Sequence, residues 1–370
     1  MSSSRPTAIR KSEDLVGPDA ATSWTLPSWV YLDPAVLERE QRALFGRTWQ
    51  IVGRREQVSN AGDYFTTELV GEPLLIVRGQ DGKLRGFYNV CRHRAGPPAS
   101  GCGNRKVFRC GYHGWTYGLD GGLVNAPEMD GTAEFDYGQF GLRPVATAEW
   151  GAWVFVNLDA SAEPLETELR ELPAQAARYG LEKLKLYKRH DYVMECNWKV
   201  YIDNYLEGYH LPSVHPGLNR ELDYGQYVTE TYEHHSRQYS PIRGPQNESS
   251  GQRRYAQARG DEVVDYFWIF PNWMLNCYPD NTSLNIVLPL GLEKTVAIFE
   301  WYFPEEVLQT DAPARTVAFS DEIQVEDGQI CELVHRNLKS RSYDRGRFSA
   351  KQERCVHHFH RLYSEWMKNS

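Results

Sequence analysis

The chain has 370 residues, of which 41% are hydrophobic and 24% are charged, so it can bury a sizeable core in two domains. Its formal charge is −8 and it has no Lys/Arg block, which makes nucleic acid and anionic membrane surfaces poor partners. No apolar run is long enough to span a bilayer, and residues 1–10 lack the apolar core of a secretory signal. We therefore expect a cytoplasmic protein.

The first part of the chain predicts a terminal segment followed by a β domain. Residues 1–45 are expected to form a tail and a short helix that packs on the C-terminal domain. Over residues 46–160, short β-branched and aromatic runs such as 64–69 and 74–78 alternate with glycine-containing turns. Strand signals at this spacing predict a small all-β domain.

The second part, residues 161–370, has mixed signals that predict an α+β domain. A stretch rich in Glu and Leu begins it, a loop-rich polar region lies in its middle, and long strands precede a C-terminal helix. The expected helices cover residues 162–186, 198–209 and 311–339, the polar region covers 234–255, and the expected strands cover 263–270, 283–289 and 294–303.

Four residues in the β domain form a motif with metal-ligand spacing. Cys91 and His93 are followed after sixteen residues by Cys110 and His113, the pattern C-x-H-x16-C-x2-H. Each half offers one thiolate and one imidazole from a glycine-containing loop. Two thiolates on one iron and two imidazoles on the other hold a [2Fe–2S] cluster whose potential is higher than that of an all-cysteine cluster.

The main alternative for this motif is a structural zinc site, which also uses two Cys and two His. Zinc modules usually keep like ligands together, whereas each half here is mixed. The spacing therefore favours the cluster. Cys102 lies between the halves but breaks the mixed-pair pattern.

A second dense group of candidate ligands lies in residues 197–215, which include the expected helix over 198–209. On a continuous helix Asp203, Glu207 and His210 share one face. Pro212 is expected to end the helix and let the following loop bring His215 back towards His210. Two imidazoles with one carboxylate from a distant part of the sequence make a facial triad that leaves positions open for dioxygen and substrate. Taken alone, both histidines are equally well explained as buried core residues.

Asp327 is the preferred third ligand. It lies at the edge of an apolar stripe formed by Ile330, Val334 and Leu338 in the predicted C-terminal helix. A carboxylate against an apolar face usually needs a cation partner. Alone, this residue is also explained as a negative charge near a helix N-terminus.

The cluster motif, the segment D-N-Y-L-E-G-Y-H-x4-H at residues 203–215 and the late Glu326-Asp327 pair resemble the oxygenase α subunit of Rieske non-haem iron oxygenases. The resemblance covers the chain from about Trp49 to its end. It is strongest to the choline and carnitine monooxygenase branch, through residues 203–207, 270–276, 287–291 and 326–338, together with residues 345–348 and 357–360 near the end.

The resemblance implies an N-terminal all-β Rieske [2Fe–2S] domain and a C-terminal helix-grip catalytic domain with one mononuclear Fe(II). It further implies a homotrimer that uses O2 and electrons from an NAD(P)H-dependent reductase or a ferredoxin. Glu207 takes the position of the carboxylate that bridges one subunit's cluster to the neighbour's iron. Many members have Asp there, and Asp203 is the alternative bridge.

The substrate stays open between two classes. The branch implies a quaternary ammonium compound such as choline, betaine or carnitine, which aromatic faces would hold. A ring-hydroxylating oxygenase acting on an aromatic acid would use the same side chains for stacking. A Rieske-type electron carrier, the alternative without catalysis, needs only the first motif and a much shorter chain. The candidate pocket residues are Tyr266, Trp268, Phe270, Trp273 and Tyr278.

Overall fold

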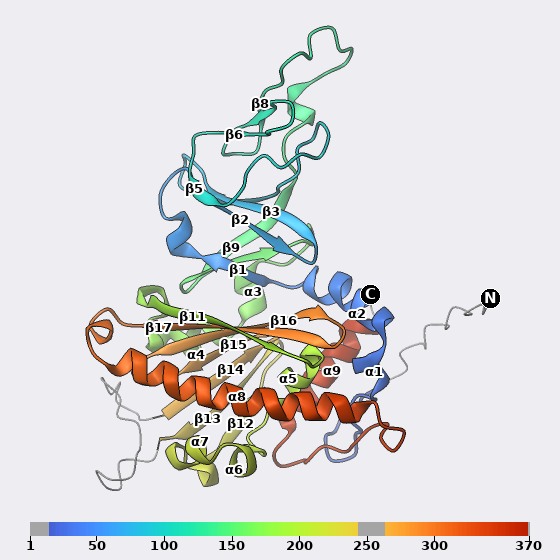
Figure 1. Cartoon of the computed structure of the whole chain (residues 1–370), viewed down its shortest axis with the longest axis vertical. Coiled ribbons are helices and arrows are strands. Elements are labelled where there is room, and N and C mark those ends of the chain that lie inside the picture. The colour runs from blue at the N-terminus through green and yellow to red at the C-terminus, as the bar shows by residue number, and fades with distance from the viewer. Residues whose placement is uncertain (1–14, 243–262, 369–370) are drawn as a thin grey trace, which may run out of the picture.

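The computed structural model describes residues 15–242 and 263–368, and in it the strands form two seven-stranded antiparallel sheets and one small three-stranded sheet. The first sheet stands above the second in Figure 1, and a long helix crosses the face of the second sheet. The α+β class expected for the chain is confirmed. Among the described residues, no helix is both long and apolar enough to cross a membrane.

The first sheet, with the order β1-β10-β9-β4-β3-β2-β5, builds the upper part of the molecule. Its inner strand β3 is buried on both faces, because Leu74 through Val77 are fully covered. A small three-stranded sheet lies at its far end and holds the second candidate cluster loop, residues 110–115, between two of its strands. The strands of the first sheet are β1 (Gln50–Arg54), β2 (Asp63–Leu69), β3 (Glu72–Arg78), β4 (Leu84–Tyr88), β5 (Cys102–Asn104), β9 (Pro144–Trp150) and β10 (Trp153–Asn157). The small sheet has β6 (Phe108–Arg109), β7 (Thr116–Tyr117) and β8 (Leu123–Asn125).

The second sheet has the order β11-β17-β16-β15-β14-β13-β12, and helices pack on both of its faces. Its strands are β11 (Lys185–Met194), β12 (Val228–Thr231), β13 (His235–Pro241), β14 (Val263–Ile269), β15 (Trp273–Cys277), β16 (Thr282–Gly291) and β17 (Lys294–Phe303). The helices are α3 (Leu165–Leu169), α4 (Leu172–Ala176), α5 (Trp198–Tyr205), α6 (Leu211–Val214), α7 (Pro216–Glu221), α8 (Ala312–Leu338) and α9 (Arg354–Lys368). The core between the sheet and α5, α8 and α9 holds the candidate iron site in place.

A second core joins the two sheets. Trp153 and Phe155 of β10 pack with Trp273 and Tyr302 of the second sheet, together with the apolar faces of α3 and α4. The indole Nε1 of Trp153 donates a hydrogen bond of 3.0 Å to the Tyr302 hydroxyl. This contact fixes the upper sheet on the face of the second sheet opposite α8.

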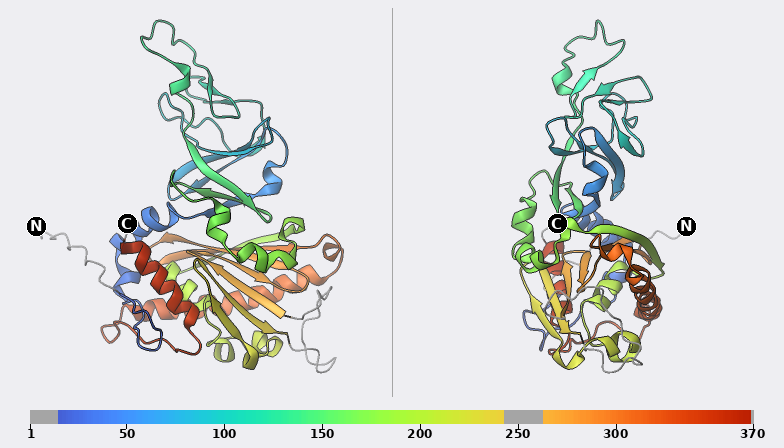
Figure 2. Two further views of the ribbon diagram at one scale, coloured as in Figure 1. Left: turned by 180° about the vertical axis from the view of Figure 1, so that it is seen from behind. Right: turned by 90° about the vertical axis from the view of Figure 1, so that its left-hand side faces the viewer.

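The N-terminal helices α1 (Trp29–Leu32) and α2 (Pro34–Glu40) lie against the second part of the chain. Figure 2 shows from behind that α9, in red, lies beside them. Glu40 is fully buried and accepts bonds from Lys199 Nζ at 2.6 Å, Trp198 Nε1 at 2.8 Å and the Tyr363 hydroxyl at 2.6 Å. The segment therefore braces α5, while the exact domain boundaries stay predictions.

Three expected elements differ from the observed ones. The expected helix over residues 162–186 is instead two short helices and two 3-10 turns, followed by β11. β11 is a mostly exposed strand, so its sequence lacks apolar alternation. The expected loop over residues 234–255 contains β13, and its part from residue 243 onward lies outside the described residues. The helix expected over 198–209 ends at Tyr205.

Candidate active site and cluster site

Two turns at the far end of the upper sheet hold the four residues of the first motif. In the first turn Cys91 N donates to Gly96 O at 2.9 Å, and in the second Cys110 N donates to Trp115 O at 2.8 Å. A Cβ added to Gly96 would lie only 2.8 Å from Cys110 Sγ, so the two turns touch at this glycine. Glycine is needed there because no side chain fits between the backbone and the sulfur.

The sulfurs and imidazoles of these turns converge as cluster ligands would. Cys91 and Cys110 are buried, and the ring centroids of His93 and His113 are 4.6 Å apart. His93 stacks on Trp115 with centroids 4.8 Å apart. Its buried Nδ1 has no hydrogen-bond partner among the described residues, which fits a nitrogen meant for a metal. Burial, with the nearby charges of His113 and Arg94, lowers the pKa of His93 and favours the neutral ligating form.

Tyr117 is a site residue that the sequence reasoning missed. Its hydroxyl accepts from Arg92 N at 2.9 Å, which leaves its own hydrogen for Cys91 Sγ at 3.1 Å. Burial, followed by the bond to Cys91, raises the pKa of Tyr117, so the phenol stays protonated. From the sequence, Tyr117 could have been found because it lies directly after the second cluster turn, in β7.

We expect Tyr117→Phe to lower the reduction potential of the cluster while keeping the cluster itself. Hydrogen bonds to cluster sulfurs stabilise the reduced state, so removing one favours oxidation. Spectroelectrochemical titration of wild type and variant measures the shift. An unchanged potential with an intact cluster spectrum would contradict the role of this hydroxyl.

The second site lies between α5, α6 and α8. His210, His215 and Asp327 are placed so that one ligand atom from each lies within 4.8 Å of the others. His215 Nε2 is 2.9 Å and His210 Nε2 is 3.8 Å from the same oxygen, Asp327 Oδ1. Two imidazoles and one carboxylate at this spacing fit a facial triad for iron.

The local path to this triad differs from the expected one. Because α5 ends at Tyr205, Asp203, Glu207 and His210 do not share a helix face, and that prediction is wrong. Pro212 lies in the first turn of α6 rather than at a helix end. His210 precedes α6 and His215 follows it, so one short helix sets the spacing of both imidazoles.

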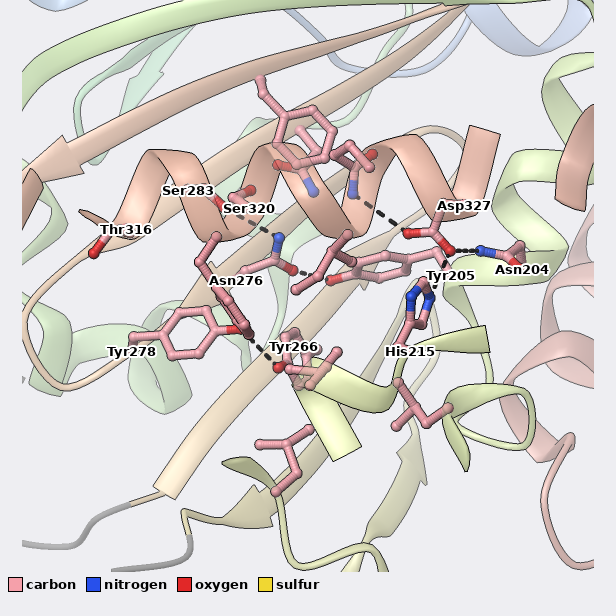
Figure 3. A pocket seen from close by; sticks show the side chains of 18 of the residues that line it. Asn204, Tyr205, His215, Tyr266, Asn276, Tyr278, Ser283, Thr316, Ser320 and Asp327 are labelled. Atoms are coloured by element: carbon pink, nitrogen blue, oxygen red, sulfur yellow. Dashed lines mark hydrogen bonds and ion pairs between the residues drawn. The ribbon is translucent and has the colours of Figure 1, made fainter. Parts of the chain in front are cut away.

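Each triad member is oriented by a neighbouring polar side chain. Asn204 Nδ2 donates to Asp327 Oδ1 at 2.6 Å, and Figure 3 shows Asp327 between Asn204 and His215. His210 Nδ1 lies 2.6 Å from Glu207 Oε1, and His215 Nδ1 lies 2.7 Å from Glu326 Oε2. Both rings thus turn Nε2 towards Asp327, the arrangement seen when an outer carboxylate fixes a ligand's tautomer.

The charge balance of the triad favours a bound cation. Burial by itself lowers the pKa of His215, but its bonds to Asp327 and Glu326 raise that pKa overall. The two carboxylates therefore stabilise positive charge at this ring, which a proton or a metal ion can supply.

Glu326 belongs to the late acidic pair of the sequence motif but had no predicted role. In the structure its carboxylate bonds His215. We expect Glu326→Ala to weaken iron affinity by about 10- to 100-fold, because the His215 ring loses the hydrogen-bond partner that fixes its orientation. Iron content after dialysis against graded chelator measures this. Equal iron retention in variant and wild type would show that Glu326 does not orient His215.

Asp203 is not brought to this triad. Its carboxylate accepts from the Tyr31 hydroxyl at 2.7 Å and bonds His360 Nε2 at 2.8 Å. Since His360 Nδ1 already accepts from Leu26 N, its Nε2 carries the hydrogen that Asp203 accepts. Asp203 therefore ties α5 to α9 and the N-terminal helices.

A cavity of about 100 Å³ opens beside the triad. Of the five predicted pocket residues, only Tyr266 and Tyr278 line it. Their hydroxyls are 2.9 Å apart and point toward each other in Figure 3. The prediction for Trp268, Phe270 and Trp273 is wrong. The full lining is Tyr201, Asn204, Tyr205, Glu207, His210, Leu211, His215, Leu218, Leu222, Tyr227, Tyr266, Asn276, Tyr278, Asn281, Ser283, Asn285, Phe299, Trp301, Thr316, Phe319, Ser320, Ile323, Gln324 and Asp327.

The three misplaced aromatics are core residues on neighbouring elements. Trp268 packs on Phe359 of α9 and donates to Pro271 O at 3.2 Å. Phe270 lies past the end of β14 in the same core. Trp273 belongs to the core between the two sheets. An aromatic-rich strand does not reveal from sequence which of its residues face a cavity.

Comparison with known proteins places this geometry in a family. Residues 48–136 match the Rieske [2Fe-2S] domain, and residues 181–369 match the catalytic domain of the ring-hydroxylating α subunit. The chain belongs to the Rieske ring-hydroxylating oxygenases. This oxygenase α subunit is therefore an enzyme that holds a [2Fe–2S] cluster and a mononuclear iron and acts on a small substrate with O2.

Relatives of this oxygenase include two enzymes acting on ammonium compounds. It is 37% identical to the chloroplastic choline monooxygenase of Arabidopsis thaliana over 91% of this chain and 82% of that protein. It is 33% identical to the carnitine monooxygenase oxygenase subunit of Escherichia coli K12, over 94% of this chain and 95% of that protein.

Solved structures agree with this family placement. A quaternary ammonium Rieske monooxygenase studied for carnitine oxidation matches with a TM-score of 0.86 and 30% identity, covering 97% and 100% of the two chains. A naphthalene 1,2-dioxygenase at 18% identity and a TM-score of 0.75 shares the fold.

Proposed function

We propose that this oxygenase is the terminal component of a monooxygenase system that hydroxylates a small quaternary ammonium compound. Its electrons come from NAD(P)H through a reductase or ferredoxin partner. It works as a homotrimer, and a cytoplasmic location stays a prediction.

The lining of the cavity is the observation that carries the substrate class. Eight aromatic side chains surround the space, five of them tyrosines, among them Tyr205, Tyr227 and Tyr278. Aromatic faces attract a cation whose nitrogen has no hydrogen to donate. Among the described residues, the lining contains no Lys or Arg side chain. The relatives that act on choline and carnitine support the same class.

We assign the [2Fe–2S] cluster and the mononuclear iron to the two sets of ligand residues described above. The cluster would be held by the Cys91–His93 and Cys110–His113 pairs, and the iron by His210, His215 and Asp327. The iron, when bound, supplies oxygen activation. Asn204, Glu207 and Glu326 hold its ligands in orientation.

The arrangement of one chain supports electron transfer between subunits. The cluster turns lie at the far end of the upper sheet and the triad lies below the second sheet, so the body of the protein separates them (Figure 1). Glu207 bonds His210 on its inner side, and its neighbour Tyr209 is 58% exposed. We assign Glu207 as the bridge to a neighbour's cluster. The related quaternary ammonium Rieske monooxygenase is described with inter-subunit electron transfer.

The test is oxygen uptake by the purified oxygenase with a reductase and NADH, over choline, glycine betaine, carnitine and a set of aromatic acids. We expect uptake coupled to product formation with at least one quaternary ammonium compound and none with the aromatic acids. A coupled response to aromatic acids alone would overturn this substrate class.

A further inference from the structure

Gln324 on α8 is a buried amide that bonds one oxygen of the candidate iron ligand Asp327. The two residues are three positions apart on the same helix, so their side chains lie on one face. His215 and His210 approach Asp327 through its Oδ1, whereas Gln324 Nε2 donates to its Oδ2 at 3.4 Å. The two oxygens of this carboxylate therefore have different neighbours.

The orientation of the Gln324 carboxamide is fixed by Tyr201 on α5. The buried Tyr201 hydroxyl donates to Gln324 Oε1 at 2.5 Å. A reversed amide would turn its carbonyl oxygen towards the Asp327 carboxylate, and two acceptors cannot bond each other. Burial raises the pKa of Tyr201 well above its usual value and the charge of Asp327 adds to this, so the phenol keeps the hydrogen that it donates. The bonds thus run in one direction, from Tyr201 through Gln324 to Asp327.

Amide donors hold the Asp327 carboxylate at both of its oxygens. Asn204 Nδ2 donates to Oδ1 at 2.6 Å (Figure 3), and among the described residues Oδ2 has Gln324 as its hydrogen-bond partner. A carboxylate can bind a metal ion through one oxygen or through both. An oxygen that accepts from a buried donor must give up that bond to reach a metal, which leaves the donor unsatisfied. Binding through both oxygens would also fill a position that a facial triad otherwise leaves open.

We propose that Gln324, oriented by Tyr201, keeps Oδ2 of Asp327 engaged, so that Asp327 binds the iron through Oδ1 alone. Gln324 is then a positioning residue that acts through Asp327 and preserves an open position at the metal for dioxygen or substrate. This inference rests on the proposed function, which assigns the iron to His210, His215 and Asp327.

The test is a pair of crystal structures, of wild type and of Gln324→Met, each loaded with iron(II) under anaerobic conditions. In wild type the metal should lie about 2.0–2.2 Å from Asp327 Oδ1, the usual length of a metal–carboxylate bond, with Oδ2 outside bonding distance and on Gln324. Methionine has a similar length but no amide, so in the variant both oxygens should bind the metal. Turnover of this variant should fall by about 10- to 100-fold at unchanged iron content.

A second readout in solution is the electron paramagnetic resonance signal of the nitric oxide adduct of the mononuclear iron, recorded with the cluster oxidised and therefore silent. Its line shape should change in Gln324→Met, and also in Tyr201→Phe, which removes the hydroxyl that orients the amide. Tyr363→Phe is the matched control, because Tyr363 is also buried but its hydroxyl donates to Glu40. This control should give the wild-type signal.

Two metal–oxygen bonds from Asp327 in wild type, or a single bond in both wild type and Gln324→Met, would overturn the role of Gln324. The wild-type structure decides this even if the variant does not fold. A wild-type signal in Tyr201→Phe would overturn the part of Tyr201. Wild-type protein that binds no iron beyond that of its cluster would instead overturn the assignment of the iron in the proposed function, and this inference with it.

Discussion

His210→Ala is expected to purify with its [2Fe–2S] cluster intact and without the mononuclear iron. The triad has one ligand atom from each of three residues, so the loss of one leaves His215 and Asp327 alone. Iron analysis should fall from about three to about two atoms per chain, while the cluster absorbance is unchanged. Turnover should fall by more than about 100-fold, beyond the effect of losing an outer partner.

His357→Ala is the matched control for this prediction. His357 is buried, and its Nε2 bonds Gly17 O at 2.8 Å, away from the triad. It should keep all the iron, although it should lose some stability. Full iron content in His210→Ala, or loss of the cluster from that variant, would show that the two constellations are not the separate sites described here.

Glu207→Gln is expected to keep both metal groups and to slow electron transfer to the iron. Glu207 Oε1 faces His210 Nδ1, and Oε2 accepts from the backbone N–H groups of Tyr209 and His210. An amide in this place can still face His210 through its oxygen, but its NH2 group cannot accept from a second histidine. Turnover should therefore fall by about 10- to 100-fold.

The measurement is a single turnover in which cluster-reduced protein is mixed with O2 and substrate. Reoxidation of the cluster, followed by its absorbance, should be slower in Glu207→Gln at unchanged iron content. Asp203→Asn is the comparison variant, because Asp203 bonds Tyr31 and His360 rather than the triad. Slow reoxidation in Asp203→Asn with a normal rate in Glu207→Gln would move the bridge to Asp203.

How much was predictable depended on how local each feature is. The long strands of the second sheet follow apolar and aromatic runs, and β17 (Lys294–Phe303) has the expected bounds. The C-terminal helix α8 was expected to within a residue at each end, since its apolar stripe is periodic. β11 was not predicted, because an exposed edge strand carries polar residues.

The position at which α5 ends was also not predicted from the sequence. Residues up to His210 read as one helical face, yet the helix stops at Tyr205 and Glu207 caps the next turn through its carboxylate. Side chains that bond nearby backbone groups compete with the helix, and tertiary packing decides which wins.

The sequence by itself determined the cluster motif, because each of its halves holds a Cys and a His within a single turn and the two turns lie close along the chain. Only the tertiary structure decided the iron site and its cavity. His215 and Asp327 are 112 residues apart, and their contact depends on how α8 packs against α5 and α6. The same packing decided that Tyr266 faces the cavity and that Trp268 faces the core. Such contacts arise from long-range packing, which no local spacing encodes.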